Sequence, residues 1–86
     1  MNTQEIRQLV EQDKLVIGYN EVRQAIIDKA VSSVLIATNA EQARADAMKD
    51  YCLLSEVTCE TTPLRNDQVG TACRKPFSIS FIAVKN

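Results

Sequence analysis

The stretch Lys14-Leu-Val-Ile-Gly-Tyr-Asn-Glu-Val-Arg-Gln-Ala-Ile-Ile-Asp-Lys29 changes from a strand-like to a helix-like pattern at Gly18. Residues 14–17 form a short, mostly apolar run that is typical of a buried strand. The next three residues, 18–20, form a turn. Apolar residues then recur with helical spacing, which predicts a helix over 21–29. The apolar positions of this helix are Val22, Ala25, Ile26 and Ala30.

The same two patterns alternate along the rest of the chain. We expect further helices over residues 2–13, 39–54 and about 66–73, and further strands over 33–37, 57–61 and 77–84. The order is therefore α-β-α-β-α-β-α-β, which favours a sheet sandwiched between helices. The 86 residues suffice for one domain, over 1–86.

Local signals place the ends and faces of these elements. Asn2 with Glu5 resembles a capping box, and Thr38 with Glu41 forms one at the start of the third helix. Asn66 or Asp67 caps the fourth. The expected buried positions of the third helix are Ala43, Ala47, Tyr51 and Leu54, and those of the fourth are Val69, Ala72 and Cys73. On the last strand, Phe77, Ile79, Phe81 and Ala83 share one face.

The composition of the chain excludes several classes of function. The chain has no histidine and only two glycines, so it offers neither a Cys–His or Ser–His nucleophile nor a Gly-rich phosphate loop. Its three cysteines include no Cys-x-x-Cys pair, which argues against a zinc site or a disulfide framework and for a reducing, cytosolic setting. We therefore expect that the protein is not an enzyme and binds no cofactor, metal or small-molecule substrate. There is no signal-peptide pattern and no run long enough to span a membrane.

Three segments carry a resemblance. They are Gly18-Tyr-Asn-Glu-Val-Arg-Gln-Ala-Ile-Ile-Asp-Lys-Ala30, Val34-Leu-Ile-Ala-Thr-Asn-Ala40 and Asn66-Asp-Gln-Val-Gly-Thr-Ala-Cys-Arg-Lys-Pro-Phe77. In this order and spacing they resemble the L-seven-Ae/L-thirty-e superfamily of RNA-binding proteins, and within it the large-subunit ribosomal L-thirty-e family. The resemblance implies a three-layer α/β/α sandwich with a four-stranded mixed sheet. It also implies a cytoplasmic, ribosomal protein that binds a kink-turn or internal loop of rRNA, with neighbouring ribosomal proteins as possible partners.

The resemblance assigns RNA contacts to three strand–helix junctions, the places where ligands gather in such sheets. The matching positions are Gly18, Tyr19, Asn20, Glu21 and Gln24 at the first junction, Asn39 and Ala40 at the second, and Arg74, Lys75 and Phe77 at the third. The N-terminus of a helix attracts phosphate. Amide and carboxylate side chains recognise the edges of bases, and aromatic rings pack on unpaired bases.

Each of these residues also has a structural explanation. A tight turn alone would explain Gly18, an N-cap alone would explain Asn20, and a favourable interaction with the helix dipole alone would explain Glu21. Phe77 can simply begin the core face of the last strand. Gln24 stands where kink-turn relatives often have Lys, which removes one phosphate-binding charge.

Charge is the observation that opposes RNA binding. The net charge is −1 and the sequence pI about 5.3, whereas nucleic-acid-binding domains are usually basic. A local basic rim would answer this objection; its candidates are Arg23, Lys29, Arg65, Arg74 and Lys75. The same residues can equally be an ordinary solvated surface. Two rival functions follow: a kink-turn binder of a non-ribosomal ribonucleoprotein, and a protein-interaction domain that has lost RNA affinity.

Overall fold

A computed structural model describes residues 2–86, so Met1 of the expected domain lies outside the described residues. The elements follow the predicted alternation of helix and strand. The helices are α1 (Thr3–Glu11), α2 (Tyr19–Ile27), α3 (Gln42–Leu54) and α4 (Asn66–Ala72). The strands are β1 (Leu15–Ile17), β2 (Val31–Ile36), β3 (Thr58–Thr61) and β4 (Phe81–Lys85).

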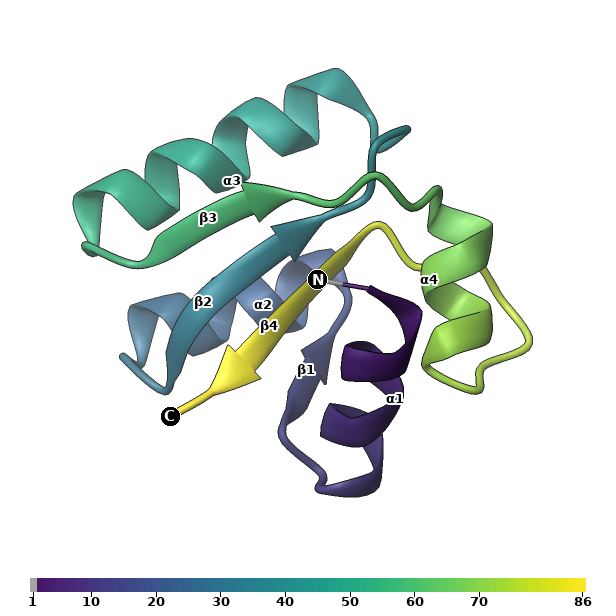
Figure 1. Ribbon diagram of the computed structural model, residues 1–86. Coiled ribbons are helices and arrows are strands. Elements are labelled where there is room, and N and C mark those ends of the chain that lie inside the picture. The colour runs from purple at the N-terminus through teal and green to yellow at the C-terminus, as the bar shows by residue number, and fades with distance from the viewer. Residues whose placement is uncertain (1) are drawn as a thin grey trace.

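The four strands form one mixed sheet in the order β1-β4-β2-β3 (Figure 1). β4 is antiparallel to both of its neighbours, whereas β2 and β3 run parallel. The central register pairs Val34 of β2 with Ala83 of β4 on one side and with Cys59 of β3 on the other. The strand that comes last along the chain thus lies inside the sheet.

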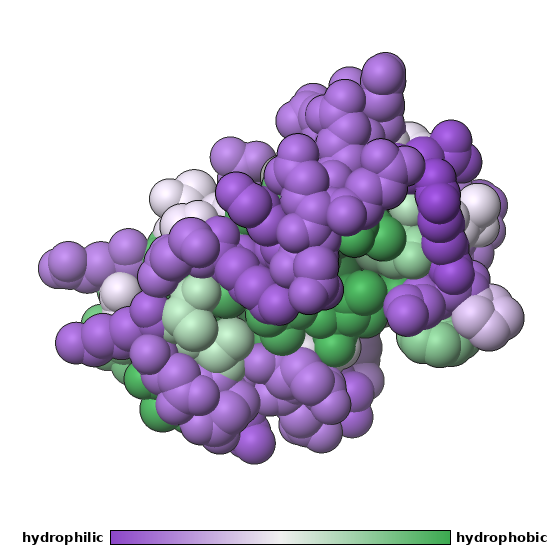
Figure 2. All heavy atoms as spheres, turned by 90° about the horizontal axis from the view of Figure 1, so that it is seen from below, coloured by the Kyte–Doolittle hydropathy of each residue, from purple (hydrophilic) through white to green (hydrophobic). Residues whose placement is uncertain are grey.

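Each face of the sheet has its own apolar core, because successive strand residues point to opposite faces. Val34 and Ile36 of β2 pack on the side of α2 and α3, while Leu35 between them packs on the side of α1 and α4. Phe81 and Ile82 of β4 divide in the same way. The predicted three-layer α/β/α sandwich with a four-stranded mixed sheet is confirmed. Seen from below, hydrophobic atoms reach the surface in a band between largely hydrophilic regions (Figure 2).

Helix α2 begins two residues earlier than expected. Gly18 is its N-cap and has φ +105°, a conformation that residues with a Cβ rarely adopt. The Gly18 N–H donates to the carbonyl of Phe81 (N–O 3.0 Å), and its carbonyl accepts the N–H of Val22 (2.9 Å). One residue therefore ends β1 and starts α2. Asn20 lies inside the first turn of the helix, so the N-cap explanation of Asn20 is wrong.

Helix α3 differs from its prediction in both start and face. It begins at Gln42 rather than Asn39, and Thr38 does not cap it. Ala43 and Leu54 are exposed, whereas the buried row is Ala45, Met48 and Cys52. Alanines occur on several sides of this helix, so helical spacing alone fits more than one face. Burial raises the pKa of the Cys52 thiol to about 12, with a smaller effect from the neighbouring Cys59.

The last strand is shorter than predicted because the alternating pattern continues into a loop. β4 begins at Phe81, and Phe77 is 57% exposed rather than part of a core face. Ile79 is buried, but it joins the core under α1 and α4, on the side opposite Phe81. The segment 77–80 is therefore a loop that connects α4 to the central strand.

Candidate nucleic-acid interface

The three strand–helix junctions meet in one groove at one end of the sheet. The groove has a volume of about 680 Å³. It is lined by Gly18, Tyr19 and Glu21 from the first junction, Asn39 from the second and Phe77 from the third. The other lining residues are Ile17, Glu41, Arg44, Asn66, Ser78, Ile79, Ser80 and Phe81. Segments up to 64 positions apart, from Ile17 to Phe81, therefore form a single surface.

The first wall of the groove is the N-terminus of α2. Among the described residues, no side chain caps this end of the helix. The first N–H groups of a helix lack intrahelical partners and carry partial positive charge, so they suit an anionic oxygen. A Cβ at residue 18 would lie 2.6 Å from a carboxylate oxygen of Glu21. The absent side chain thus lets the Glu21 carboxylate lie over the turn, at the edge of the groove.

The second wall carries a cation that the sequence analysis missed. The guanidinium carbon of Arg44 lies 5.2 Å from the ring centroid of Tyr19, within the range of a cation–π interaction. The Tyr19 ring also packs edge-on against Phe81, with centroids 5.2 Å apart. Arg44 forms a long ion pair with Glu41 (Nε–O 3.7 Å). Tyr19 is therefore a half-buried support of the groove that holds Arg44 at its surface.

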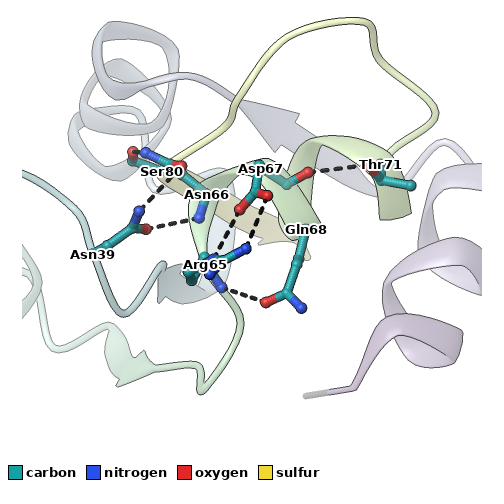
Figure 3. A network of polar contacts seen from close by, with 7 residues as sticks. All are labelled: Asn39, Arg65, Asn66, Asp67, Gln68, Thr71 and Ser80. Atoms are coloured by element: carbon teal, nitrogen blue, oxygen red, sulfur yellow. Dashed lines mark hydrogen bonds and ion pairs between the residues drawn. The ribbon is translucent and has the colours of Figure 1, made fainter.

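The third wall is fixed by a network of amide side chains (Figure 3). Asn39 Oδ1 accepts the main-chain N–H of Asn66 (2.7 Å), and Asn39 Nδ2 donates to Asn66 Oδ1 (3.3 Å). Asn66 Nδ2 donates to Ser80 Oγ (3.4 Å). The turn after β2, the start of α4 and the end of the 77–80 loop are thus joined side by side.

Phe77 is the most exposed apolar side chain of the groove. Beyond it lies a smaller hollow of about 290 Å³, which Phe77 and Ser78 share with the groove. This hollow is also lined by Asp67, Thr71, Lys75 and Pro76. Lys75 therefore lies next to the groove, on the far side of Phe77, rather than in it.

Four further residues assigned from the sequence do not line the groove. Asn20 is exposed on the first turn of α2, and Gln24 is exposed and donates to Asp28 (3.1 Å). Ala40 is half-buried against the core beneath α2 and α3. Arg74 pairs with Glu11 (3.0 Å), which ties the end of α4 to α1.

The candidate basic residues do not form one rim around the groove. Arg65 pairs with Asp67 (3.3 Å), and its hydrogen bond lowers the pKa of that carboxyl group. Lys29 follows the C-terminal end of α2, whereas the groove is at the N-terminal end of that helix. Among the described lining residues of the groove, Arg44 is the one cation, beside Glu21 and Glu41. The described lining side chains therefore carry one positive and two negative charges, and attraction for an RNA phosphate is confined to Arg44.

The fold is that of a known class of small α/β/α proteins. A protein of unknown function from Bacillus halodurans superposes with a TM-score of 0.88 at 18% identity, over 94% of this chain and 80% of that one. The Giardia lamblia 15.5kD RNA binding protein superposes with a TM-score of 0.84 at 14% identity, over 94% and 68%. At these identities the likeness establishes the fold.

The sequence establishes the family. The chain belongs to the ribosomal protein L7Ae/L30e/S12e/Gadd45 family, whose sequence model matches residues 2–86. The large ribosomal subunit protein eL30 of Pyrobaculum calidifontis is 28% identical over 80 residues, 93% of this chain and 79% of the relative. The eL30B protein of Schizosaccharomyces pombe is 31% identical over 71 residues, 83% of this chain and 61% of the relative. The resemblance seen in the sequence is confirmed.

The longest described helix, α3, has 13 residues, and no helix in residues 2–86 is long and apolar enough to cross a membrane. Within the same residues, no group of three or more Cys, Asp or Glu side chains is arranged to hold a metal ion.

Proposed function

We propose that this chain is a protein of the large ribosomal subunit, one RNA-binding domain that clamps a kink-turn or internal loop of rRNA in its groove. Membership of the family and the eL30 relatives support this function. The observation that carries it is the meeting of three distant junctions in one groove that offers an uncapped helix, a cation and an exposed ring. The proposed role is structural, without catalysis, and its place is the cytoplasmic ribosome.

The groove suits RNA that is bent or unpaired, because sequence-specific RNA recognition acts on bases with free edges and faces. In the proposed complex the bend of the RNA lies at the start of α2, where the Glu21 carboxylate lies over the Gly18 turn. Glu21 accepts hydrogen bonds from a guanine edge. The exposed ring of Phe77 stacks on an unpaired base, and Arg44 contacts the backbone of the opposite strand.

The assigned residues outside the groove have lesser roles in the proposal. Asn20 projects from the first turn of α2 beside the groove and contacts a base edge. Gln24 and Lys75 reach RNA that extends beyond the groove on either side. Arg74 keeps its ion pair with Glu11 and acts mainly by holding α4, and Ala40 supports the wall from the core.

The test is RNA affinity combined with ribosome association. Asn20→Ala and Glu21→Ala should each weaken binding of kink-turn RNA by about 1–3 kcal/mol, by analogy with bidentate base contacts. Asp50→Ala, which removes an exposed acid of α3 away from the groove, is the matched control and should leave affinity unchanged. Co-sedimentation of the wild-type chain with large ribosomal subunits tests the ribosomal part. Full affinity in the Asn20/Glu21 double variant would exclude the proposed site.

One observation favours a second candidate, a protein-interaction domain. The chain has a net charge of −1, and its groove holds two carboxylates against one guanidinium. This candidate predicts no binding of any kink-turn RNA at low salt, together with co-purification of a protein partner. Binding of kink-turn RNA without co-sedimentation would instead favour a non-ribosomal ribonucleoprotein.

A further inference from the structure

We infer that Asn66 is a positioning residue for the groove: it sets the distance between the Asn39 turn and the 77–80 loop, and RNA affinity depends on it through these two segments. The inference rests on the proposed RNA-binding function. In the sequence, Asn66 is only a candidate helix cap. In the structure it is the first residue of α4, with Arg65 as the N-cap.

Four hydrogen bonds converge on Asn66, two to its main chain and two to its side chain. Its N–H donates to Asn39 Oδ1 (2.7 Å), and its carbonyl accepts the N–H of Ile79 (3.0 Å). Its side chain accepts from Asn39 Nδ2 and donates to Ser80 Oγ (3.3 and 3.4 Å). Asn66 thus contacts both of the other segments that form this side of the groove (Figure 3).

The main chain determines how both amide groups are oriented. An N–H group can only donate, so the atom of Asn39 nearest to it must be the oxygen. The Asn39 amide nitrogen then faces Asn66, which must present its own oxygen in return. That leaves the Asn66 amide nitrogen for the hydroxyl of Ser80. The three side chains therefore form a directed chain of hydrogen bonds.

The network lies where a shift would alter the proposed RNA contacts. Asn39, Asn66 and Ser80 all line the groove, and Ser80 lies three residues after Phe77. The Ala37 N–H also donates to the Ser80 carbonyl (2.8 Å), so a main-chain bond already holds the end of the loop to the residue that follows β2. Main-chain groups of Asn66 already bond Ile79 of the loop and the Asn39 side chain, and the Asn66 side chain adds a direct link between Asn39 and Ser80.

Double-variant cycles on the affinity for kink-turn RNA test the inference. Asn66→Ala should weaken binding about tenfold and Ser80→Ala about threefold, from the loss of two and of one hydrogen bond. The double variant should be no weaker than Asn66→Ala alone, because both changes break the same restraint. Asn66→Ala combined with Asn20→Ala should instead multiply the two losses. Multiplied losses for Asn66 and Ser80 would overturn the inference and indicate an independent RNA contact of Asn66.

A spectroscopic readout tests the same residue without RNA. In ¹⁵N-correlated NMR spectra of the free protein, Asn66→Ala should move the side-chain amide signals of Asn39 and the main-chain signals of 77–80. Asn66→Asp keeps an acceptor for Asn39 and for the Ser80 hydroxyl, and should return these signals towards their wild-type positions. Asp50→Ala, on α3 and outside both the groove and the hollow beside it, is the control. Unmoved Asn39 signals in Asn66→Ala would contradict the inference, whereas failure of the wild type to bind RNA would contradict only the proposed function.

Discussion

Gly70 lies in the middle of α4, where glycine normally costs a helix about 1 kcal/mol relative to alanine. Its presence is explained by the 77–80 loop, which crosses the helix at this point. A Cβ on residue 70 would lie 2.0 Å from the carbonyl oxygen of Phe77 and 3.4 Å from the Cα of Ser78. The missing side chain allows main chain to lie directly on main chain, and the exposed Phe77 ring is placed by that contact.

We expect Gly70→Ala to lower the free energy of unfolding by about 1–3 kcal/mol, because the added methyl group must push the loop away. Urea denaturation of the two proteins measures the difference. Thr71→Ala on the next residue adds no atom near the loop and should stay within about 0.5 kcal/mol of wild type. A more stable Gly70→Ala protein would mean that helix propensity outweighs the contact.

The assigned residues that line the groove at its first junction depend on local chemistry. Gly18 ends a strand and starts a helix, so locating this junction in the sequence also locates its neighbours Tyr19 and Glu21. Arg44 was missed because its place depends on where α3 begins. That start was predicted too early, since Thr38 and Glu41 resemble a capping box. In the folded chain the Asn39 side chain between them is bonded to Asn66, 27 positions away, and no local pattern reveals that.

At the scale of elements, α3 shows why the type of element is easier to predict than its face. The alternation of helix and strand along the chain follows from periodicity and is confirmed throughout. The face of α3 depends on its partners, α2 and the sheet. These bury Ala45, Met48 and Cys52 and leave Leu53 and Leu54 at 78% and 83% exposure. The start of β4 is equally hard to predict, because the alternation of apolar and polar residues continues into the loop before Phe81.

The buried face of α3 seen in the structure predicts that truncation to alanine lowers stability at one position and leaves it almost unchanged at another. Met48 is 0% exposed, and Met48→Ala should destabilise the protein by about 2–5 kcal/mol through the cavity it leaves. Leu54 is 83% exposed, and Leu54→Ala should change stability by less than about 0.5 kcal/mol. Thermal or urea unfolding measures both. Equal losses in the two variants would show that the end of α3 packs against the core.

For the whole molecule, the distribution of charge matters more than its sum. Ten basic and eleven acidic residues nearly cancel, and three of the arginines are in ion pairs. The low net charge follows from the sequence alone. Among the described residues that line the groove there is no continuous basic surface, because Arg44 is accompanied there by Glu21 and Glu41. Recognition in the proposed complex therefore depends on shape and hydrogen bonds more than on counterion release.

This charge distribution predicts a weak salt dependence of RNA binding. Each neutralised phosphate contributes about −0.7 to −0.9 to the slope of log K against log salt. With one cation in the groove and Lys75 beside it, we expect a slope of about −1 to −2. Titrations of kink-turn RNA at several KCl concentrations measure it, and Arg44→Ala should make it shallower by about one. A slope steeper than about −4 would indicate that RNA binds another, more basic surface.

The central position of β4 has a consequence for how the protein is made. β1, synthesised early, pairs with β4 alone in the sheet order, and the groove takes its last wall from residues 77–81. Synthesis runs from the N-terminus at about 5–20 residues per second. For most of that time an emerging chain has apolar strands without partners and no finished surface for RNA. The order of the strands therefore delays formation of the groove, and with it the proposed RNA binding, until β4 has been synthesised and has left the ribosome.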